Sequence, residues 1–465
     1  DSARLPIFLA ALMPGPLTLT QAWQGINFEA YEEENMTAQF QQLSTVSFAV
    51  IASLSTFLLP AQAQNLADIY QATRSYDASY QAALSQSTAT IARGEQAKAG
   101  IWPVAGFQVG ASRSILDASG APSTTNIGSQ NASLTASQPL YRPTNWVNYA
   151  QGEKQASVAK AQLLVAEQEL IVRTSQTYFD VLAAIDTLTF VLAQKAAVAE
   201  QLASAKRNFE VGTSTITDTR EAQARFDLVI AQEIAAENDV RVKKMALDQL
   251  VGKNNIEPKP LAIPLTLPPL APSDVSQWVA QTETNHPSIT QAKLALEVAQ
   301  LETSKAELGH KPTLDLNASL GLNRNEGSAA SANTTRSKSG TIGLAFNWPL
   351  FAGFAVQNRI KETLALEDKA RADLDVAKRT VAQATRAAFF GVQSGLSSVK
   401  AFEAAEFSSQ SALDANKLGY QVGVRINIDV LNSQSQLFQT KRDLAKARYD
   451  VLLGGLKLNQ ANGTL

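Results

Sequence analysis

The protein has 465 residues, of which 45% are hydrophobic, 18% charged and 7% aromatic, so it can bury a large core and is not a disordered charged tail. Its formal net charge is −2 and no block of lysine or arginine stands out, which argues against nucleic acid as a partner. It contains no cysteine, which excludes disulfides, thiolate metal sites and cysteine nucleophiles.

The first patterned segment is an apolar run that begins at Phe48 and ends in the small-x-small sequence before residue 64. The run is too short to span a bilayer comfortably, and it predicts a signal peptide over residues 36–63 that is cleaved after Ala63. A short buried helix is the alternative, because the segment before the run carries no lysine or arginine. Residues 1–35 do not resemble a sequence that belongs ahead of a signal peptide, and we interpret them as an over-extended reading frame.

The remaining chain contains an internal duplication, which predicts two structural repeats over residues 64–252 and 275–465. A proline-rich connector, residues 253–274, separates them, and its prolines favour an extended chain over a regular helix. Four matched pairs keep nearly one offset: Ser75 with Asn285 and Pro139 with Pro349 are 210 residues apart, and Tyr178 with Phe389 and Gly212 with Gly423 are 211 apart.

Each repeat shows the same predicted order of elements. A helical stretch of about 35 residues is followed by two strands of about 10–13 residues, a very long helix and a return helix of about 36 residues. Between the two strands, stretches rich in Gly, Ser, Asn and Thr indicate exposed turns. The helical stretches are Leu66–Gly100 and Ser273–Gly309, and the long helices are about Asn145–Phe209 and Ala355–Tyr420.

The strands alternate apolar with polar or small residues, as in the series Leu314, Leu316, Ala318, Leu320 and Leu322. Four strands cannot close a barrel, and open edges are not tolerated in lipid, so we expect three chains to share a twelve-stranded barrel. A pair of hairpins that caps a soluble helical rod is the alternative.

The long helices have the pattern of a coiled coil. Apolar residues recur every seven positions at Leu164, Ile171, Tyr178, Ile185 and Leu192. A helix of about 65 residues spans about 100 Å, which is roughly three times the thickness of a bilayer core.

Four features carry a family resemblance: "TYFDVLAAIDTL" (Thr177–Leu188), "FEVGTSTITDTREAQARFD" (Phe209–Asp227), "GYQVGVRINIDVLNSQSQLFQTKRDLAKARYDVL" (Gly419–Leu452) and the duplicated Pro-Leu-aromatic strand ends. With these features the chain resembles the TolC family of trimeric outer-membrane channel-tunnels. The resemblance implies a mainly α-helical fold with a membrane β-barrel, in which three protomers share twelve strands and continue as a helical tunnel into the periplasm. It also implies a homotrimer in outer-membrane lipid that works with a periplasmic adaptor and an inner-membrane ABC exporter or proton-driven pump. The proline-rich connector would fall in the equatorial region.

The two Val-Gly breaks are the informative sites. Gly212 and Gly423 can adopt positive φ and predict tight helix-to-helix turns. By resemblance, Tyr420 and Arg425 would hold the periplasmic entrance closed through polar links to Asp218 and Thr217. These four residues form the predicted gate latch.

The resemblance also places Asp429 in an acidic ring at the pore entrance, and simple capping of the return helix is the alternative. The family often has a second Asp one turn later, where this chain has Asn432, so a single ring with weaker affinity for blocking cations is expected.

We expect no enzymatic activity, cofactor or metal. The two histidines, His286 and His310, are interpreted as solvent-facing, and the sequence has neither a phosphate-binding loop nor a nucleophile motif. The main alternative function is a secreted filament subunit of the flagellin-like helical type. The cargo, protein or small molecule, stays open.

Overall fold

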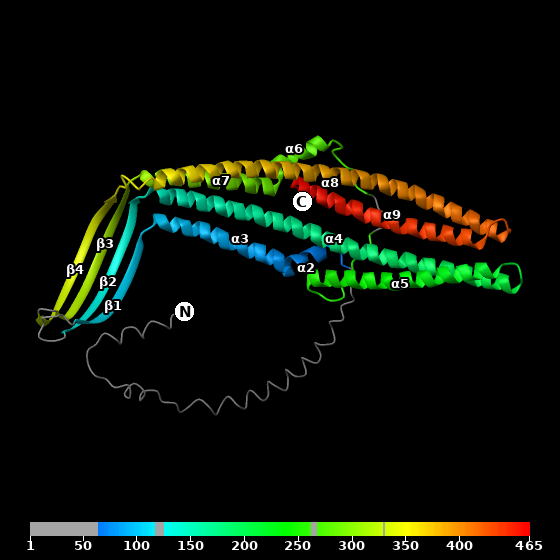
Figure 1. Cartoon of the computed structure of the whole chain (residues 1–465), viewed down its shortest axis with the longest axis horizontal. Coiled ribbons are helices and arrows are strands. Elements are labelled where there is room, and N and C mark those ends of the chain that lie inside the picture. Colours follow the sequence, from blue (N-terminus) through cyan, green and yellow to red (C-terminus); the bar gives the residue numbers. More distant parts are fainter. Residues whose placement is uncertain (1–63, 117–124, 262–266, 329–330) are drawn as a thin grey trace, which may run out of the picture. The chain divides into compact units, whose positions relative to one another are not determined.

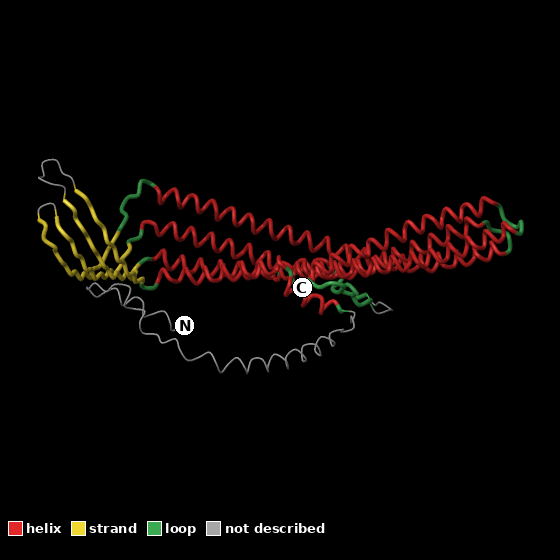
Figure 2. Tube along the Cα trace, turned by 90° about the horizontal axis from the view of Figure 1, so that it is seen from below, coloured by secondary structure: helices red, strands yellow, loops and turns green. Residues whose placement is uncertain are grey.

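The computed structural model describes residues 64–116, 125–261, 267–328 and 331–465. The predicted signal peptide and the predicted over-extended segment lie outside these residues. Figures 1 and 2 show that, from residue 64 onward, long helices run side by side, with the strands at one end and two helix-to-helix turns at the other. The prediction of a mainly α-helical, internally duplicated fold is confirmed.

The two repeats have the same sequence of elements. The first repeat consists of α2 (Leu66–Tyr76), α3 (Ala78–Ala97), a 3-10 turn η2 (Lys98–Ile101), β1 (Val104–Leu116), β2 (Thr125–Tyr141), α4 (Pro143–Glu210) and α5 (Ile216–Val251). The second consists of α6 (Val275–Asn285), α7 (Pro287–Glu307), η3 (Leu308–His310), β3 (Thr313–Ser328), β4 (Ser331–Asn347), α8 (Ala355–Gln421) and α9 (Asn427–Asn462).

The predicted helical stretches of about 35 residues are each divided in two, so the expectation of one continuous helix is wrong. Asp77 leaves the helical region with φ −59° and ψ 114°, and its carboxylate caps α3 by accepting from the Tyr80 backbone N–H at 2.8 Å. His286 has φ −71° and ψ 125°, because the proline that follows it disfavours a helical conformation.

The four strands form one antiparallel sheet in the order β1-β2-β3-β4, so the pairing of β2 with β3 joins the two repeats. The strands have 13, 17, 16 and 17 residues, so β1 has the expected length and β2, β3 and β4 are longer than expected. The Ser- and Thr-rich stretch near Asn325 was predicted as a turn, but it continues the ladder by pairing with Thr335. Its backbone groups pair regardless of side-chain polarity, and threonine favours strands.

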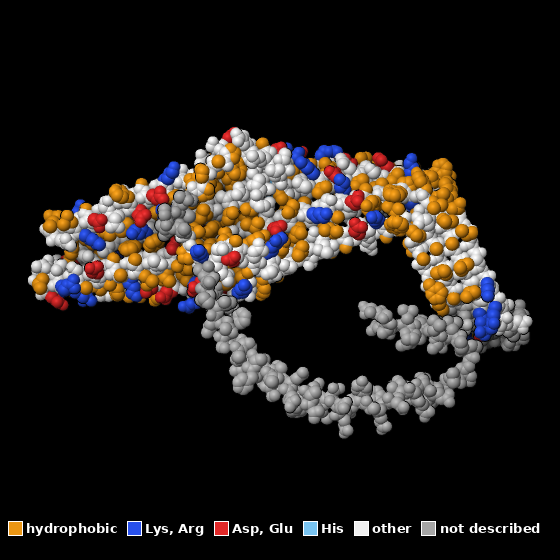
Figure 3. All heavy atoms as spheres, turned by 180° about the vertical axis from the view of Figure 1, so that it is seen from behind, with side chains coloured by type: hydrophobic (Ala, Val, Ile, Leu, Met, Phe, Trp, Pro, Cys, Tyr) orange, Lys and Arg blue, Asp and Glu red, His pale blue; other side chains and the backbone are white. Residues whose placement is uncertain are grey.

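One face of the sheet is apolar across all four strands, as the alternation predicted. Directly paired residues share a face, so the register places these side chains together: Phe107 opposite Leu134, Leu134 opposite Leu320, Ala318 opposite Ile342, and Leu314 opposite Phe346. Phe107 and Ile342 are 72% and 76% exposed in one chain. Figure 3 shows the hydrophobic side chains over the strands. This face needs an apolar surrounding.

The long helices pair with their return helices as coiled coils. Buried residues recur every seven positions in three helices: Ala184, Val191, Val198 and Ala205 in α4, Ala222, Val229 and Ala236 in α5, and Val430, Leu437, Leu444, Val451 and Leu458 in α9. A strict seven-residue repeat implies a left-handed supercoil.

The predicted stripe of α4 has the correct period but is only partly buried within one chain. Tyr178 is buried, whereas Leu164 and Leu192 are 52% and 43% exposed. Beyond Tyr178, the buried residues lie one position earlier in the sequence than the predicted stripe, so that Val191 is buried and Leu192 is not. Among the described helices, α4 alone is long and apolar enough to cross a membrane, a test that packed core helices also pass. Part of its apolar surface packs against α5 and α9.

The start of the connector is attached to the body of the fold. Gln64 forms a parallel bridge with Pro258, and its carbonyl accepts from the Lys259 N–H at 3.0 Å. The Tyr178 hydroxyl donates to the Lys259 carbonyl at 2.6 Å, which ties the connector to α4. Where it is described, the connector is extended rather than helical, as its prolines predicted.

Candidate functional site at the two helical turns

The two turns between long and return helices have the same backbone geometry. Gly212 and Gly423 have φ of +77° and +80°, which an L side chain rarely adopts. A Cβ at either position would meet no atom within 4 Å, so the backbone conformation and not the space explains the glycine. In each turn two successive N–H groups reach one carbonyl, that of Asn208 in the first turn and Gly419 in the second. Both glycines therefore lie in tight turns between a long helix and its return helix.

The first turn is closed by its own side chains. Thr215 caps α5, and Asp218 completes a capping box by accepting from the Thr215 N–H at 3.1 Å. The Ser214 hydroxyl also donates to Asp218, at 2.6 Å. Partial burial alone would raise the pKa of Asp218, but the hydrogen bonds from Ser214 and Thr215 outweigh it and hold that pKa below its usual value.

The second turn lacks this box. Ile426 is the cap residue of α9 and offers no side-chain oxygen, although Asp429 stands where Asp218 stands in the first turn. Arg425 replaces Ser214 and lies 3.7 Å from Asp429. The side chains of Arg425 and Asp429 are 58% and 33% exposed, so this ion pair contributes at most about 1 kcal/mol.

Three of the four predicted latch residues line one groove between the turns, with a volume of about 920 Å³: Asp218, Tyr420 and Arg425. Thr217 is exposed and does not line it. The hydroxyl of Tyr420 accepts from the Asn208 amide at 3.2 Å. Among the described residues of one chain, no hydrogen bond or ion pair joins Asp218 to Tyr420 or Arg425, so the latch stays a prediction.

Asn432 lies one helical turn beyond Asp429 on α9. It is exposed, and its side-chain oxygen accepts from the Arg225 guanidinium of α5 at 2.8 Å. This contact joins the two repeats at the level of the predicted pore entrance.

Sequence reasoning missed Asn427, the first residue of α9, which is fully buried. Its side-chain oxygen accepts from the Gln201 amide of α4, and its amide donates to the Asp218 carbonyl of α5 at 3.2 Å. The first repeat has Ile216 at the corresponding position, 211 residues earlier. An asparagine in place of an apolar residue in one of two duplicated turns is the signal that could have revealed it.

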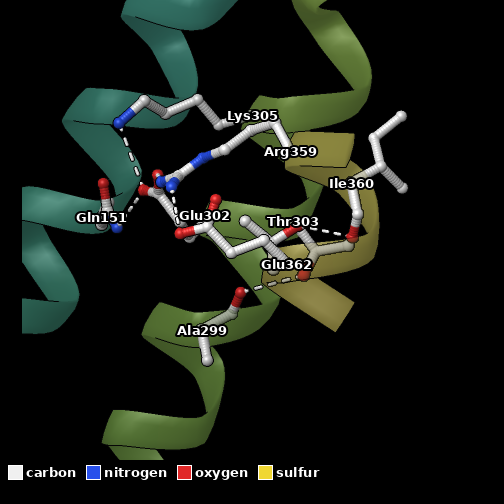
Figure 4. Close-up of polar contacts among 9 residues, drawn as sticks. Gln151, Ala299, Glu302, Thr303, Lys305, Arg359, Ile360 and Glu362 are labelled. Carbon is white, nitrogen blue, oxygen red and sulfur yellow. Dashed lines mark hydrogen bonds and ion pairs between the residues drawn. The ribbon is translucent and has the colours of Figure 1, made fainter. Parts of the chain in front are cut away.

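A second polar cluster lies where α4, α7 and α8 meet, at the end of the helices nearest the strands (Figure 4). Glu302 of α7 accepts from Gln151 of α4 at 3.0 Å and pairs with Arg359 of α8 at 2.7 Å and with Lys305 at 3.1 Å. Partial burial would raise the pKa of Glu302, but these three donors lower it. The charges satisfy one another, which indicates that the cluster holds three helices together.

Both histidines are partly buried, and the side chain of one of them caps a helix. His286 is partly buried instead of solvent-facing, and its Nδ1 caps α7 by accepting from the Ser288 N–H at 3.1 Å, while burial lowers its pKa. The His310 carbonyl accepts from the Trp348 indole at 3.1 Å. Within the described residues, no group of three or more His, Cys, Asp or Glu side chains could hold a metal ion.

Comparison with known proteins gives consistent matches along the chain. The outer membrane efflux protein family matches residues 69–253 and again 278–464, in agreement with the duplication. Among curated relatives, the outer membrane protein TolC of Escherichia coli is 32% identical, over 89% of this chain and 85% of TolC. The TolC of Vibrio cholerae is 33% identical, over 90% and 94% of the two chains. The proteases secretion protein PrtF of Dickeya chrysanthemi is 28% identical, over 90% and 92%.

Solved structures share the fold at lower identity. The outer membrane protein VceC of Vibrio cholerae superposes with a TM-score of 0.73 at 19% identity, covering 86% of this chain and 96% of VceC. CusC, whose crystal structures are reported for transmembrane channel formation, superposes with a TM-score of 0.74 at 16% identity. The match covers 86% of this chain and 92% of CusC. The matches offer no support for a flagellin-like filament.

Proposed function

The chain belongs to the outer membrane efflux protein family and is an outer-membrane efflux or secretion channel, and on that premise we propose that it is the exit duct of a tripartite exporter. Three protomers form a passive channel, which an adaptor and an inner-membrane pump open at the periplasmic end. The observation that carries the proposal is the two-part family match on a chain whose repeats end in apolar strands on one side and duplicated helical turns on the other. The family is one of efflux proteins and not of enzymes.

The sheet supports the trimer. In one chain it has four strands, two unpaired edges at β1 and β4, and an exposed apolar face. Lipid tolerates no open edge, and joining β1 of each protomer to β4 of the next closes a barrel of twelve strands. Strands of 13 to 17 residues are long enough to cross the outer membrane at a tilt.

The helices support a tunnel that reaches far beyond the membrane. α4 and α8 have 68 and 67 residues, which corresponds to about 100 Å of helix. Their outward apolar residues, such as Leu164 and Phe407, remain exposed in one chain and offer surface for the neighbouring protomers.

The gate lies at the two turns. We propose that Asp218 and Thr217 are the acceptors for Tyr420 and Arg425 of the same or a neighbouring protomer, and that Asp429 lines the entrance. Asp218, Tyr420 and Arg425 line the same groove, which supports polar links among them. Asn432 contributes no charge, so one acidic ring is expected at the entrance.

The pump with which the channel works would decide its cargo. A periplasmic adaptor and an ABC exporter would imply type I protein secretion, for which the name of PrtF gives a precedent, and a proton-driven pump would imply drug efflux. Both classes of pump fit a passive duct.

Reconstitution tests the proposal. The purified protein should migrate as a trimer in detergent and give discrete single-channel steps in planar bilayers. In cells, chemical cross-linking should capture it with an adaptor only when a pump is co-expressed. A monomer that leaves bilayers unpermeabilised would contradict the channel, and conducting trimers that never cross-link to an adaptor would contradict the tripartite assignment.

A further inference from the structure

The two turns are not equivalent, and the difference points to a residue outside the predicted latch. The first turn is closed by a capping box of its own. In place of a capping box, the second turn has an exposed ion pair between Arg425 and Asp429. An apolar core with Val430 and Leu437 holds α9 to α8, but the position of this helix pair against the first repeat depends on contacts between the two repeats.

Of Asn427, Tyr420 and Asn432, whose side chains make such contacts, Asn427 is the buried one, at 0% exposed. The side chain accepts from Gln201 of α4 and donates at 3.2 Å to the backbone carbonyl of Asp218 in α5. The Asn427 amide therefore joins the α8/α9 pair to both α4 and α5. We call Asn427, Gln201 and the Asp218 carbonyl the clasp.

Apolar packing on the same side of α9 surrounds the clasp. Leu431 is buried in the core between α4 and α5, and Ile428 packs against that core. Asn427 is 0% exposed, so a displacement of α9 that breaks its bonds leaves the amide without partners until water from the adjoining groove reaches it. Such a contact favours two discrete positions of the turn over a continuum.

We propose that Asn427 is a positioning residue of the gate, whose amide holds the α8/α9 turn against α4 and α5 of its own chain and must release when the entrance opens. This inference rests on the proposed channel function. It differs from the predicted latch, because the clasp is buried, uncharged and formed within one protomer.

The test uses full-length trimers in planar bilayers. Asn427→Leu removes both bonds and keeps a side chain branched at Cγ, although leucine is larger than asparagine. It should raise the mean single-channel conductance about twofold or more, because the position held by the clasp becomes less populated. Gln201→Leu should act in the same direction, and the double variant should add little, since both substitutions remove one unit.

Two controls separate positioning from general stability. Gln223→Leu is the matched control, because the Gln223 amide donates to Asp227 one turn along its own helix at 2.9 Å, and this variant should conduct like the wild type. The swapped pair Asn427→Gln with Gln201→Asn keeps the total side-chain length and should restore part of the closed behaviour. A purely structural role would lower the melting temperature without this rescue of conductance.

A measurement that does not depend on ion conduction tests the clasp separately from the channel function. The chain contains no cysteine, so spin labels can be placed at Thr213 and Val424, which are exposed in the two turns. Asn427→Leu should lengthen and broaden the distance between the labels, and Gln223→Leu should not.

Unchanged conductance and unchanged label distances in folded Asn427→Leu trimers would overturn the clasp. If that variant does not assemble, Gln201→Leu decides by the same two measurements. A wild type that fails to conduct while Asn427→Leu still separates the labels would overturn the proposed channel and leave the clasp as a positioning contact.

Discussion

At the scale of single residues, the hydroxyl of Tyr420 and the guanidinium of Arg425 are the groups on which the predicted latch depends. Tyr420→Phe removes the hydroxyl that accepts from Asn208, and Arg425→Ser removes the charge beside Asp429. Both substitutions should raise single-channel conductance, since each polar link contributes about 1 kcal/mol and the trimer repeats it. Wild-type conductance in both variants would rule out the latch.

The predicted role of Asp429 at the entrance can be tested by measuring ion selectivity. Asp429→Ala should lower cation preference and weaken block by multivalent cations, measured from the reversal potential in a salt gradient. Asn432→Asp should do the opposite, although its charge is partly offset by Arg225, whose guanidinium already donates to this side chain at 2.8 Å. If the reversal potential of Asp429→Ala equals that of the wild type, Asp429 only stabilises the start of α9.

At the scale of elements, the two caps allow a reciprocal experiment. Thr215→Ala removes the capping box of α5 and should cost about 1 kcal/mol, seen as roughly fivefold faster amide hydrogen exchange in its first turn. Ile426→Thr places a hydroxyl before Asp429 in the second turn and should slow exchange at the start of α9. Equal exchange in wild type and Thr215→Ala would contradict a stabilising cap.

The capping box also predicts a pH dependence. Because the pKa of Asp218 is lower in the folded chain than in the unfolded one, its stabilising effect is fully present above the unfolded value, about 3.9. The effect is lost as the pH falls through the lower folded pKa. After correction for intrinsic rates, exchange at the start of α5 should therefore rise in acid below about pH 4, and Asp218→Asn should abolish this rise. If the exchange rate of Asp218→Asn still rises in acid, another titrating group causes the rise.

Sequence patterns predicted the elements well where a local rule governs them. Positive φ at Gly212 and Gly423, the seven-residue period and the alternation of the strands all follow from spacing along the chain. The contacts of Asn427 did not follow, because they depend on which segments pack together. The division at Asp77 is a local helix cap that sequence reasoning overlooked. A single buried amide carries no periodic signal.

At the scale of the whole molecule, the faces of the sheet provide the sharpest test of the shared barrel. Ile342 lies on the apolar face beside Ala318, and its neighbour Thr341 points to the opposite face. In a lipid-embedded barrel, Ile342→Arg places a charge in hydrocarbon at a cost of up to about 2–4 kcal/mol, whereas Thr341→Arg places it in the lumen.

The matched pair differs by one position in the same strand, so strand propensity and chain length stay constant. Ile342→Arg should reduce the amount of trimer in the outer-membrane fraction severalfold, and Thr341→Arg should assemble normally and shift ion selectivity towards anions. The amounts of trimer and monomer of each variant can be quantified on gels of unheated membrane samples. Equal assembly of the two variants would mean that the apolar face does not meet lipid, and the hairpins would then be a cap on a soluble helical rod.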